Sequence, residues 1–80
     1  MKIVIRKSAV KDFKKISEPY KTQIKEKIVT LQDFPDLSNI KMLINFTPSY
    51  RLRVGNYRVL FDIIDNTIEV AAIKHRKESY

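Results

Sequence analysis

Arginine side chains gather in the segment YRLRVGNYRV, residues 50–59, where Arg51, Arg53 and Arg58 surround the only glycine of the chain. A guanidinium group offers a planar fork of N–H donors that matches the oxygens of a phosphate. The segment therefore indicates a site for a phosphate-bearing polyanion. The residues leave open a plainer alternative, in which the arginines lie on a solvated strand face and are partly offset by Asp62 and Glu69.

The C-terminal segment HRKESY, residues 75–80, adds groups suited to proton transfer and stacking. His75 carries an imidazole, the side chain that ordinarily titrates near neutral pH. Arg76 and Tyr80 are four positions apart and supply a cation and a phenol. Folded onto the arginines, this tail would close a site able to hold a phosphodiester. A surface histidine and a frayed terminal tyrosine are the plainer alternatives.

Hydrophobic periodicity predicts the strands that position the arginines. In residues 50–54, apolar and basic side chains alternate, which predicts a strand with one apolar and one basic face. Gly55 and the asparagine after it predict a type II′ hairpin turn, because glycine accepts the positive φ of the first turn position. This turn sets Arg53 directly against Arg58 on the basic face. On the apolar face it pairs Val54 with Tyr57 and Leu52 with Val59.

A second two-residue turn is predicted at Asp65-Asn66, and it gives a third strand. The predicted pairs on the apolar face are Ile63 with Ile68, Phe61 with Val70 and Val59 with Ala72. In this register His75 emerges from the same face as the arginines. The sequence thus predicts that the imidazole and the guanidinium groups lie together.

The N-terminal half is predicted to hold one strand and two helices. KIVIR, residues 2–6, is rich in β-branched residues and predicts a strand. A short amphipathic helix follows from Ala9 with Ser8 as its cap, and Pro19 suits the first turn of a second helix. The apolar positions of the first helix are Val10, Phe13 and Ile16, and the buried stripe of the second is expected to be Tyr20, Ile24, Ile28 and Leu31. The second helix is expected to end at Asp33, Pro35 and Asp36.

Together these elements predict a small α+β single domain over residues 1–80, in the order strand, helix, helix, strand, strand, strand (β-α-α-β-β-β). The two helices would form a hairpin with a lysine-rich outer surface, and the last strands an antiparallel three-stranded meander. KMLIN, residues 41–45, is a candidate for a further short strand.

Composition narrows the class of partner. The 80 residues carry a formal net charge of +7, which attracts polyanions such as RNA, DNA, anionic lipid or an acidic protein. The absence of cysteine and the single histidine argue against disulfides and structural zinc. The N-terminal stretch MKIVIRKSAV has too short an apolar run for a signal peptide or a membrane span. A cytoplasmic location without membrane association is therefore expected.

The chain resembles the RelE/ParE superfamily of toxins from bacterial and archaeal toxin–antitoxin systems, and within it the RelE branch. The resemblance covers essentially the whole chain. Its most specific parts are R-x-G-x-Y-R in the hairpin, residues 53–58, and H-R-x-x-x-Y in the tail, residues 75–80. It implies a type II toxin that enters the ribosomal A site, cuts mRNA there and inhibits translation. It also implies a cognate antitoxin that wraps the toxin.

The activity implied by this resemblance is that of a metal-independent endoribonuclease, an mRNA interferase without a cofactor. The RNA 2′-hydroxyl attacks its own phosphate and leaves a 2′,3′-cyclic phosphate and a 5′-hydroxyl. The implied catalytic residues are Arg58, His75, Arg76 and Tyr80, and the implied RNA-binding residues are Arg51, Arg53, Lys74 and Lys77. Arg58 and Arg76 would stabilise the phosphorane, Tyr80 would stack on the RNA, and His75 would transfer a proton.

One departure from the RelE pattern concerns the general base. Where the best-studied RelE-type toxin has lysines, this chain has Arg51 and Arg53, and arginine does not give up its proton at cellular pH. The sequence therefore leaves the base unassigned. Two alternatives stay open. The first is a ParE-like inhibitor of DNA gyrase, although such chains generally lack the tail arginine and tyrosine. The second is a non-catalytic RNA- or ribosome-binding module.

Overall fold

A computed structural model describes residues 2–33, 40–45 and 47–77. The elements in chain order are β1 (Lys2–Ile5), α1 (Lys7–Lys14), α2 (Tyr20–Thr30), the 3₁₀ turn η1 (Leu31–Asp33), β2 (Ile40–Met42), β3 (Tyr50–Val54), β4 (Tyr57–Ile64) and β5 (Thr67–His75). This order confirms the predicted α+β fold, and it adds the candidate strand in KMLIN as β2.

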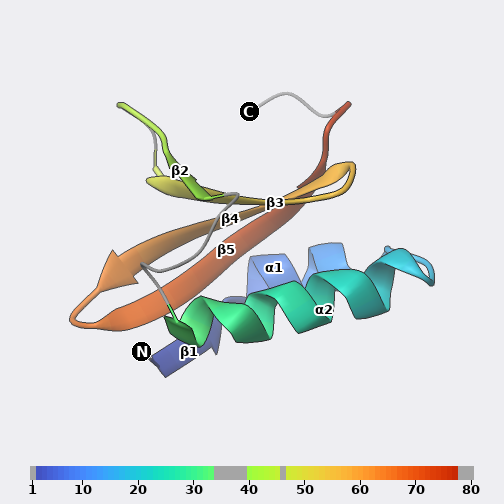
Figure 1. The fold of residues 1–80 in the computed structure, drawn as a ribbon, viewed down its shortest axis with the longest axis horizontal. Helices are drawn as coiled ribbons and strands as arrows, with labels where there is room; N and C mark the ends of the chain where they lie inside the picture. Colours follow the sequence, from blue (N-terminus) through green and yellow to red (C-terminus); the bar gives the residue numbers. More distant parts are fainter. Residues whose placement is uncertain (1, 34–39, 46, 78–80) are drawn as a thin grey trace.

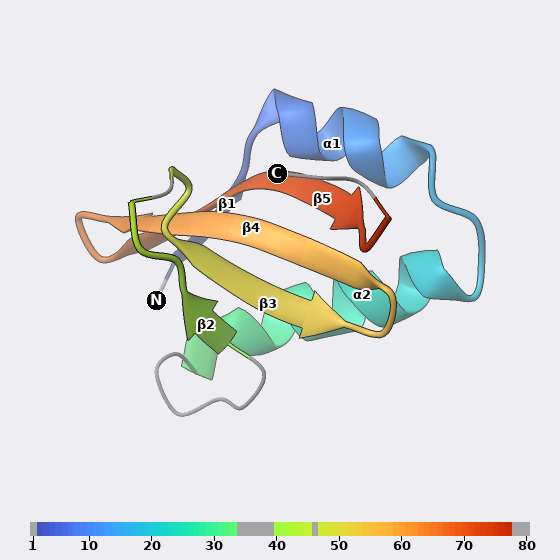
Figure 2. The same cartoon turned by 90° about the horizontal axis from the view of Figure 1, so that it is seen from above.

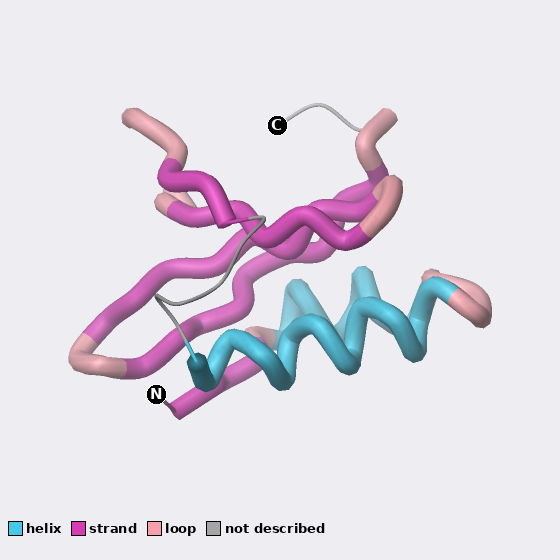
Figure 3. The backbone as a smooth tube through the Cα atoms, viewed as in Figure 1, coloured by secondary structure: helices cyan, strands magenta, loops and turns pink. Residues whose placement is uncertain are grey.

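The strands form a five-stranded sheet in the order β1-β5-β4-β3-β2. β1 runs parallel to β5, whereas the other neighbouring strands are antiparallel. Both helices lie on one side of the twisted sheet (Figure 1), and the backbone tube shows the cyan helices apart from β3 and β4, with β1 at the level of the helices (Figure 3). We call the side of the sheet away from the helices the outer face.

The hydrophobic core lies between the helices and the sheet. Its buried members are Ala9, Ile16, Ile24, Ile28, Leu31, Leu52, Val54, Val59, Phe61, Ile68, Val70 and Ile73. Phe61 of β4 is the largest of the fully buried side chains. Burying a large apolar side chain stabilises a fold by roughly 1.5–3 kcal/mol, so the helices are needed to keep this face of the sheet out of water.

Two predictions about the helices are wrong. Ser8 does not cap α1, because β1 runs directly into the helix and Arg6 occupies the N-cap position. The hydroxyl of Ser8 instead donates a hydrogen bond to the carbonyl oxygen of Ala71 in β5. Tyr20, expected to be buried, is 45% exposed, and Val10 is 39% exposed. Both side chains lie at the margins of the helix–sheet interface rather than inside it.

Pro19, predicted in the first turn of the second helix, is the N-cap residue of α2, directly before its first turn. A carboxylate supports this end of the helix: Glu18 Oε1 accepts hydrogen bonds from Thr22 Oγ1 at 2.7 Å and from the Thr22 backbone N–H at 3.0 Å. These bonds hold the pKa of the Glu18 carboxyl below its ordinary value. Asp33 lies at the end of η1, while Pro35 and Asp36, the other predicted stop signals, lie outside the described residues.

The hairpin between β3 and β4 has the predicted register, with Val54 opposite Tyr57 and Arg53 opposite Arg58. Gly55 has a φ of +56°, as the first position of a type II′ turn requires. Apart from Gly55 itself and its two chain neighbours, no atom of the described residues lies within 4 Å of the place where a Cβ would stand on Gly55. The glycine is therefore needed for its backbone conformation and not for space.

The predicted turn between β4 and β5 is also present. Asp65 and Asn66 have φ values of 49° and 59°, which is the pattern of a type I′ turn. The pairs Ile63 with Ile68 and Phe61 with Val70 are confirmed. Their register follows from the turn, because a two-residue loop leaves the first pairs of a hairpin little freedom to slip.

Beyond Phe61 the predicted register is wrong. Phe61 pairs with Val70, but Leu60 pairs with Ala72, so Ala71 is an extra residue in β5. This β-bulge reverses the alternation of β5 relative to β4. Val59 consequently pairs with Ile73, and not with Ala72 as the alternation predicts. The sequence contained a signal of this bulge. Val70 and Ile73 are both apolar but an odd number of positions apart, whereas residues on one face of a regular strand are an even number apart.

Candidate functional site

A row of cations crosses three neighbouring strands on the outer face. Arg53 of β3 lies opposite Arg58 of β4, and Arg58 lies opposite Lys74 of β5. Directly opposed residues in antiparallel strands have Cβ atoms about 4.5–5.5 Å apart. We call Arg53, Arg58 and Lys74 the cationic row. Like charges this close repel one another, so an anion bound between them would relieve the repulsion and be held strongly.

Packing on the outer face restrains the arginine side chains. Arg51 lies two residues before Arg53 on the same face, opposite Leu60. Leu60 is only 4% exposed although it faces away from the helices. Arg51 and Arg58 are half-buried, and their Nε atoms are buried. Aliphatic stems of arginine commonly pack along apolar surface in this way, which reduces the entropy that the guanidinium groups lose on binding a ligand.

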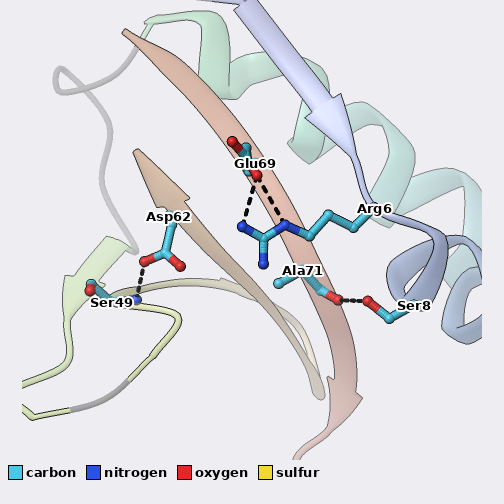
Figure 4. Close-up of polar contacts among 6 residues, drawn as sticks. All are labelled: Arg6, Ser8, Ser49, Asp62, Glu69 and Ala71. Carbon is cyan, nitrogen blue, oxygen red and sulfur yellow. Dashed lines mark hydrogen bonds and ion pairs between the residues drawn. The ribbon is translucent and has the colours of Figure 1, made fainter. Parts of the chain in front are cut away.

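Two carboxylates of the described part of the outer face, those of Asp62 and Glu69, form contacts away from the cationic row. Asp62 and Glu69 lie opposite each other, four residues along β4 from Arg58, or roughly 13 Å. Glu69 Oε1 accepts hydrogen bonds from Arg6 Nε at 3.0 Å and Nη2 at 2.7 Å, and Asp62 Oδ1 accepts one from Ser49 N at 2.7 Å (Figure 4). These structural contacts weaken the interpretation in which Asp62 and Glu69 offset the arginines.

The C-terminal tail reaches the same end of the sheet as the cationic row. The backbone N–H of Arg76 donates a hydrogen bond to the carbonyl oxygen of Asn56, 2.7 Å away in the β3–β4 turn. Arg76 and Lys77 are both exposed. Tyr80, the predicted stacking residue, lies outside the described residues. The structure therefore brings Arg76 to the end of the sheet that carries Arg53 and Arg58.

His75 does not lie on the face predicted for it. Because of the bulge, His75 pairs with Tyr57 and takes the helix side of β5, where the two rings meet edge to face with centroids 5.1 Å apart. Tyr57 also contacts Tyr20 of α2, at 5.8 Å between ring centroids. The Nδ1 atom of His75 accepts a hydrogen bond from the backbone N–H of Lys77. On the outer face, Lys74 takes the place that the alternation assigned to the imidazole.

A second feature, an apolar groove, lies on the helix side and was not predicted. It has a volume of about 410 Å³ and is lined by Ile3, Ile5, Val10, Phe13, Lys25, Ile28, Val29, Gln32 and Ile73. Ile5 and Val29 are 43% and 54% exposed. Its signal in the sequence was faint, because Val29 stands outside the predicted apolar stripe of the second helix. The groove offers apolar surface with one cation, Lys25, at its wall.

The chemistry available on the outer face is electrostatic. Within residues 2–33, 40–45 and 47–77, no group of three His, Cys, Asp or Glu side chains is placed to hold a metal ion. The cationic row and Arg76 instead offer positive charges whose backbone positions are set by a sheet and a turn. Clustered cations of this kind stabilise negative charge that develops on a phosphate. None of the described helices is long and apolar enough to span a membrane.

Known proteins with related sequences and structures share this architecture. Residues 3–80 match the family described as the ParE toxin of the type II toxin–antitoxin system parDE. Over 84 residues the chain is 33% identical to Toxin RelE3 of Methanocaldococcus jannaschii, covering 100% of this chain and 96% of that protein. It is also similar to a chain of the RelB-RelE antitoxin-toxin complex from Methanococcus jannaschii, with a TM-score of 0.77, 31% identity, and 92% and 91% of the two chains covered.

A further solved structure has the same fold at lower sequence identity. A chain of the RelBE2 toxin-antitoxin complex from Mycobacterium tuberculosis superposes with a TM-score of 0.80 at 24% identity, and the match covers 94% of this chain and 96% of that one. At that identity the likeness concerns the fold alone.

Proposed function

Because this chain belongs to the RelE/ParE superfamily of toxins from type II toxin–antitoxin systems, we propose that it is a ribosome-dependent mRNA endoribonuclease that inhibits translation. The observation that supports this proposal is the cationic row, in which Arg53, Arg58 and Lys74 from three strands meet on the outer face. Cations clustered in this way bind the phosphates of a nucleic acid backbone. In the proposed complex, the row receives mRNA in the ribosomal A site.

The proposed reaction is a transesterification within the RNA. The 2′-hydroxyl loses its proton and its oxygen bonds to the adjacent phosphorus. The bond from phosphorus to the 5′-oxygen of the next nucleotide breaks, and that oxygen takes up a proton. The products are a 2′,3′-cyclic phosphate and a 5′-hydroxyl. No metal ion or cofactor takes part in the proposed steps.

The residues divide into those that stabilise charge and those that hold the RNA. Arg58 and Arg76 are assigned to the extra negative charge of the phosphorane, where fixed donors have their largest effect. Tyr80 is assigned to stacking on a base. The RNA backbone is assigned to Arg51, Arg53, Lys74 and Lys77.

Dependence on the ribosome follows from the chemistry of the cationic row. Arginine stays protonated at cellular pH, and His75 lies on the helix side of β5. A site of this composition stabilises charge but does little to align the 2′-oxygen with the scissile bond. Alignment is worth several orders of magnitude in rate, so we assign it to the A site, which would hold the mRNA in the reactive geometry.

The proposed partner besides the ribosome is a cognate antitoxin. Solved relatives include a RelB-RelE antitoxin-toxin complex, and the apolar groove between β1, α1 and α2 is a surface that such a partner would cover. We propose that an amphipathic helix of the antitoxin lies in this groove with an acidic residue towards Lys25. Binding only the folded toxin, the antitoxin would also raise its apparent stability.

Cleavage of one mRNA, measured naked and on translating ribosomes at equal toxin concentration, tests the proposed activity. We expect products with 2′,3′-cyclic phosphate ends from the ribosome-bound mRNA and much slower cleavage of the naked RNA. Equal rates would contradict ribosome dependence, and absence of cleavage in both would contradict the nuclease.

A ParE-like inhibitor of DNA gyrase is the second candidate, because the matching family is described by its ParE toxin. The distinguishing assay is supercoiling of plasmid DNA by gyrase with and without the protein. Inhibition of supercoiling, together with intact mRNA on ribosomes, would establish the second candidate. The outer face would then be assigned to docking on a protein partner and not to RNA cleavage.

A further inference from the structure

The bulge in β5 lies at the point where β1 ends and α1 becomes the neighbour of β5 on the side away from β4. Along one side, β5 pairs with β4 over its whole length. Along the other side it pairs with β1 only as far as Val70, which lies opposite Ile5. Beyond that point the chain of β1 has turned into α1, which packs against β5 (Figure 2). The extra residue, Ala71, comes directly after this change of neighbour.

Side chains of α1 satisfy the backbone of β5 at the bulge. The backbone N–H of Arg6 donates to Val70 O at 2.9 Å, which ends the β1 pairing. The next carbonyl, that of Ala71, accepts a hydrogen bond of 2.5 Å from Ser8 Oγ (Figure 4). The N–H of Ile73 donates to Asp12 Oδ2 at 3.0 Å. Ser8 and Asp12 are four positions apart and so lie on one face of α1.

These two side chains bracket the extra residue. Ser8 holds the carbonyl of Ala71, and Asp12 holds the N–H two residues later. A bulge leaves its residues partly unpaired with the neighbouring strand, and an unpaired buried backbone group is costly. The helix thus supplies the partners that make the bulged conformation of β5 favourable at this position.

The bulge decides which side chain joins the cationic row. With Ala71 as the extra residue, Ile73 enters the core and Lys74 lies opposite Arg58 on the outer face. Without it, alternation would place Lys74 on the helix side and His75 beside the arginines. A shift of one residue would therefore remove a cation from the row.

We propose that Ser8 and Asp12 are positioning residues for the outer face: they hold the bulge at Ala71 and thereby fix Lys74 beside Arg58. They act on RNA through Lys74, without contact of their own. The RNA part of this inference rests on the proposed function, whereas the positioning of Lys74 does not.

The variant Asp12→Ala tests the inference by two independent measurements. Nuclear Overhauser contacts between the backbone amide protons of Arg58 and Lys74, which face each other in this pair, report the pairing, and so does hydrogen exchange of the Ile73 amide. The salt dependence of binding to a single-stranded RNA oligonucleotide reports the number of phosphate contacts. We expect Asp12→Ala to weaken the pairing, to speed exchange at Ile73, and to lower the slope of log K against log salt by about one contact.

Matched variants separate positioning from general effects. Lys74→Ala should lower the slope by about the same amount, and the double variant Asp12→Ala/Lys74→Ala should lower it no further, because residues that act through one group are not additive. Asp12→Asn keeps an oxygen acceptor for Ile73 N–H and should restore the slope. Asp33→Ala removes an exposed carboxylate from η1 and controls for net charge. Ser8→Ala provides the same readouts if Asp12→Ala fails to fold.

Four outcomes are decisive. Native pairing and an unchanged slope in both Asp12→Ala and Ser8→Ala would overturn the inference, as would additive losses in the double variant. In a further outcome, Asp12→Ala loses the Arg58–Lys74 pairing while no outer-face variant changes the slope of log K against log salt. That result would contradict the proposed RNA-binding function, but it would still support the positioning of Lys74 by Asp12. Loss of pairing and slope together would support both.

Discussion

Arg58 occupies the centre of the cationic row, with Arg53 on one side and Lys74 on the other. Its guanidinium is fixed at charge +1 and presents two donors side by side, which a lysine ammonium does not. This residue therefore has the position and the chemistry to meet a phosphate that gains negative charge. In the proposed function, the neighbouring cations would contribute mainly to affinity, since their charge would attract the RNA before and during the reaction alike.

His75 is expected to support structure rather than to transfer protons. Its ring packs on Tyr57 on the helix side, and its Nδ1 accepts the Lys77 N–H. His75→Gln should therefore leave the pH dependence of single-turnover cleavage unchanged in shape while lowering thermal stability slightly. The measurement is the pH–rate profile of both proteins on the same ribosomal complexes. An inflection near neutral pH that disappears in His75→Gln would restore the imidazole to the reaction.

At the scale of elements, the β3–β4 hairpin depends on one backbone conformation. Gly55 has a φ of +56° in open space, so alanine there would suffer from backbone strain alone. Gly55→Ala should lower the free energy of unfolding by about 1–2 kcal/mol. Denaturant titration checks the value, with Asn56→Ala in the same turn as control. Equal stability of Gly55→Ala and wild type would contradict the type II′ turn.

The start of α2 gives a pH-dependent prediction. Hydrogen bonds from Thr22 lower the pKa of the Glu18 carboxyl from its ordinary 4.5. A lowered folded-state pKa means that the contribution to stability is present above the ordinary pKa and is lost as pH falls through the folded-state value. Glu18→Gln should therefore melt below wild type at neutral pH, with the difference shrinking in acid. A difference that is constant across this range would contradict the role of Glu18.

The elements show why part of the site was predictable. The pairing of Arg53 with Arg58 follows from a two-residue turn, which fixes register locally. The exchange of His75 for Lys74 on the outer face depends on a bulge held by Ser8 and Asp12, more than sixty positions away in the sequence. The odd spacing of Val70 and Ile73 indicates that the alternation breaks, but strand alternation contains no information about hydrogen-bond partners so distant in the sequence. The parallel pairing of β1 with β5 is non-local for the same reason.

At the scale of the whole molecule, two different surfaces lie on opposite sides of the sheet. The outer face carries the cationic row, and the helix side carries the apolar groove. The charge of +7 made a polyanionic partner predictable, but the groove arises only when β1, α1 and α2 come together. These two surfaces of different chemistry are the ones assigned to the two proposed partners, RNA on the outer face and an antitoxin helix in the groove.

A groove variant should separate these two partners. Val29 is 54% exposed at the groove, and burial of a valine side chain is worth about 1.5 kcal/mol. Val29→Lys should therefore weaken antitoxin binding roughly tenfold or more while leaving mRNA cleavage unchanged. Calorimetric titration with the antitoxin measures the effect, and Ile64→Lys is the control, because Ile64 is an exposed apolar residue of β4 that does not line the groove. Equal weakening by both variants would place the antitoxin elsewhere.

Single-turnover cleavage of ribosome-bound mRNA by Arg58→Ala tests the central claim most directly. Lys11→Ala, which removes an exposed cation from α1, is the matched control for charge, and ribosome binding is measured in parallel. If the cationic row stabilises the phosphorane, Arg58→Ala should lose on the order of 10²-fold or more in rate, Arg58→Lys should recover only part of it, and Lys11→Ala should cleave as wild type does. Full activity of Arg58→Ala with intact ribosome binding would contradict the assignment of this face to RNA cleavage.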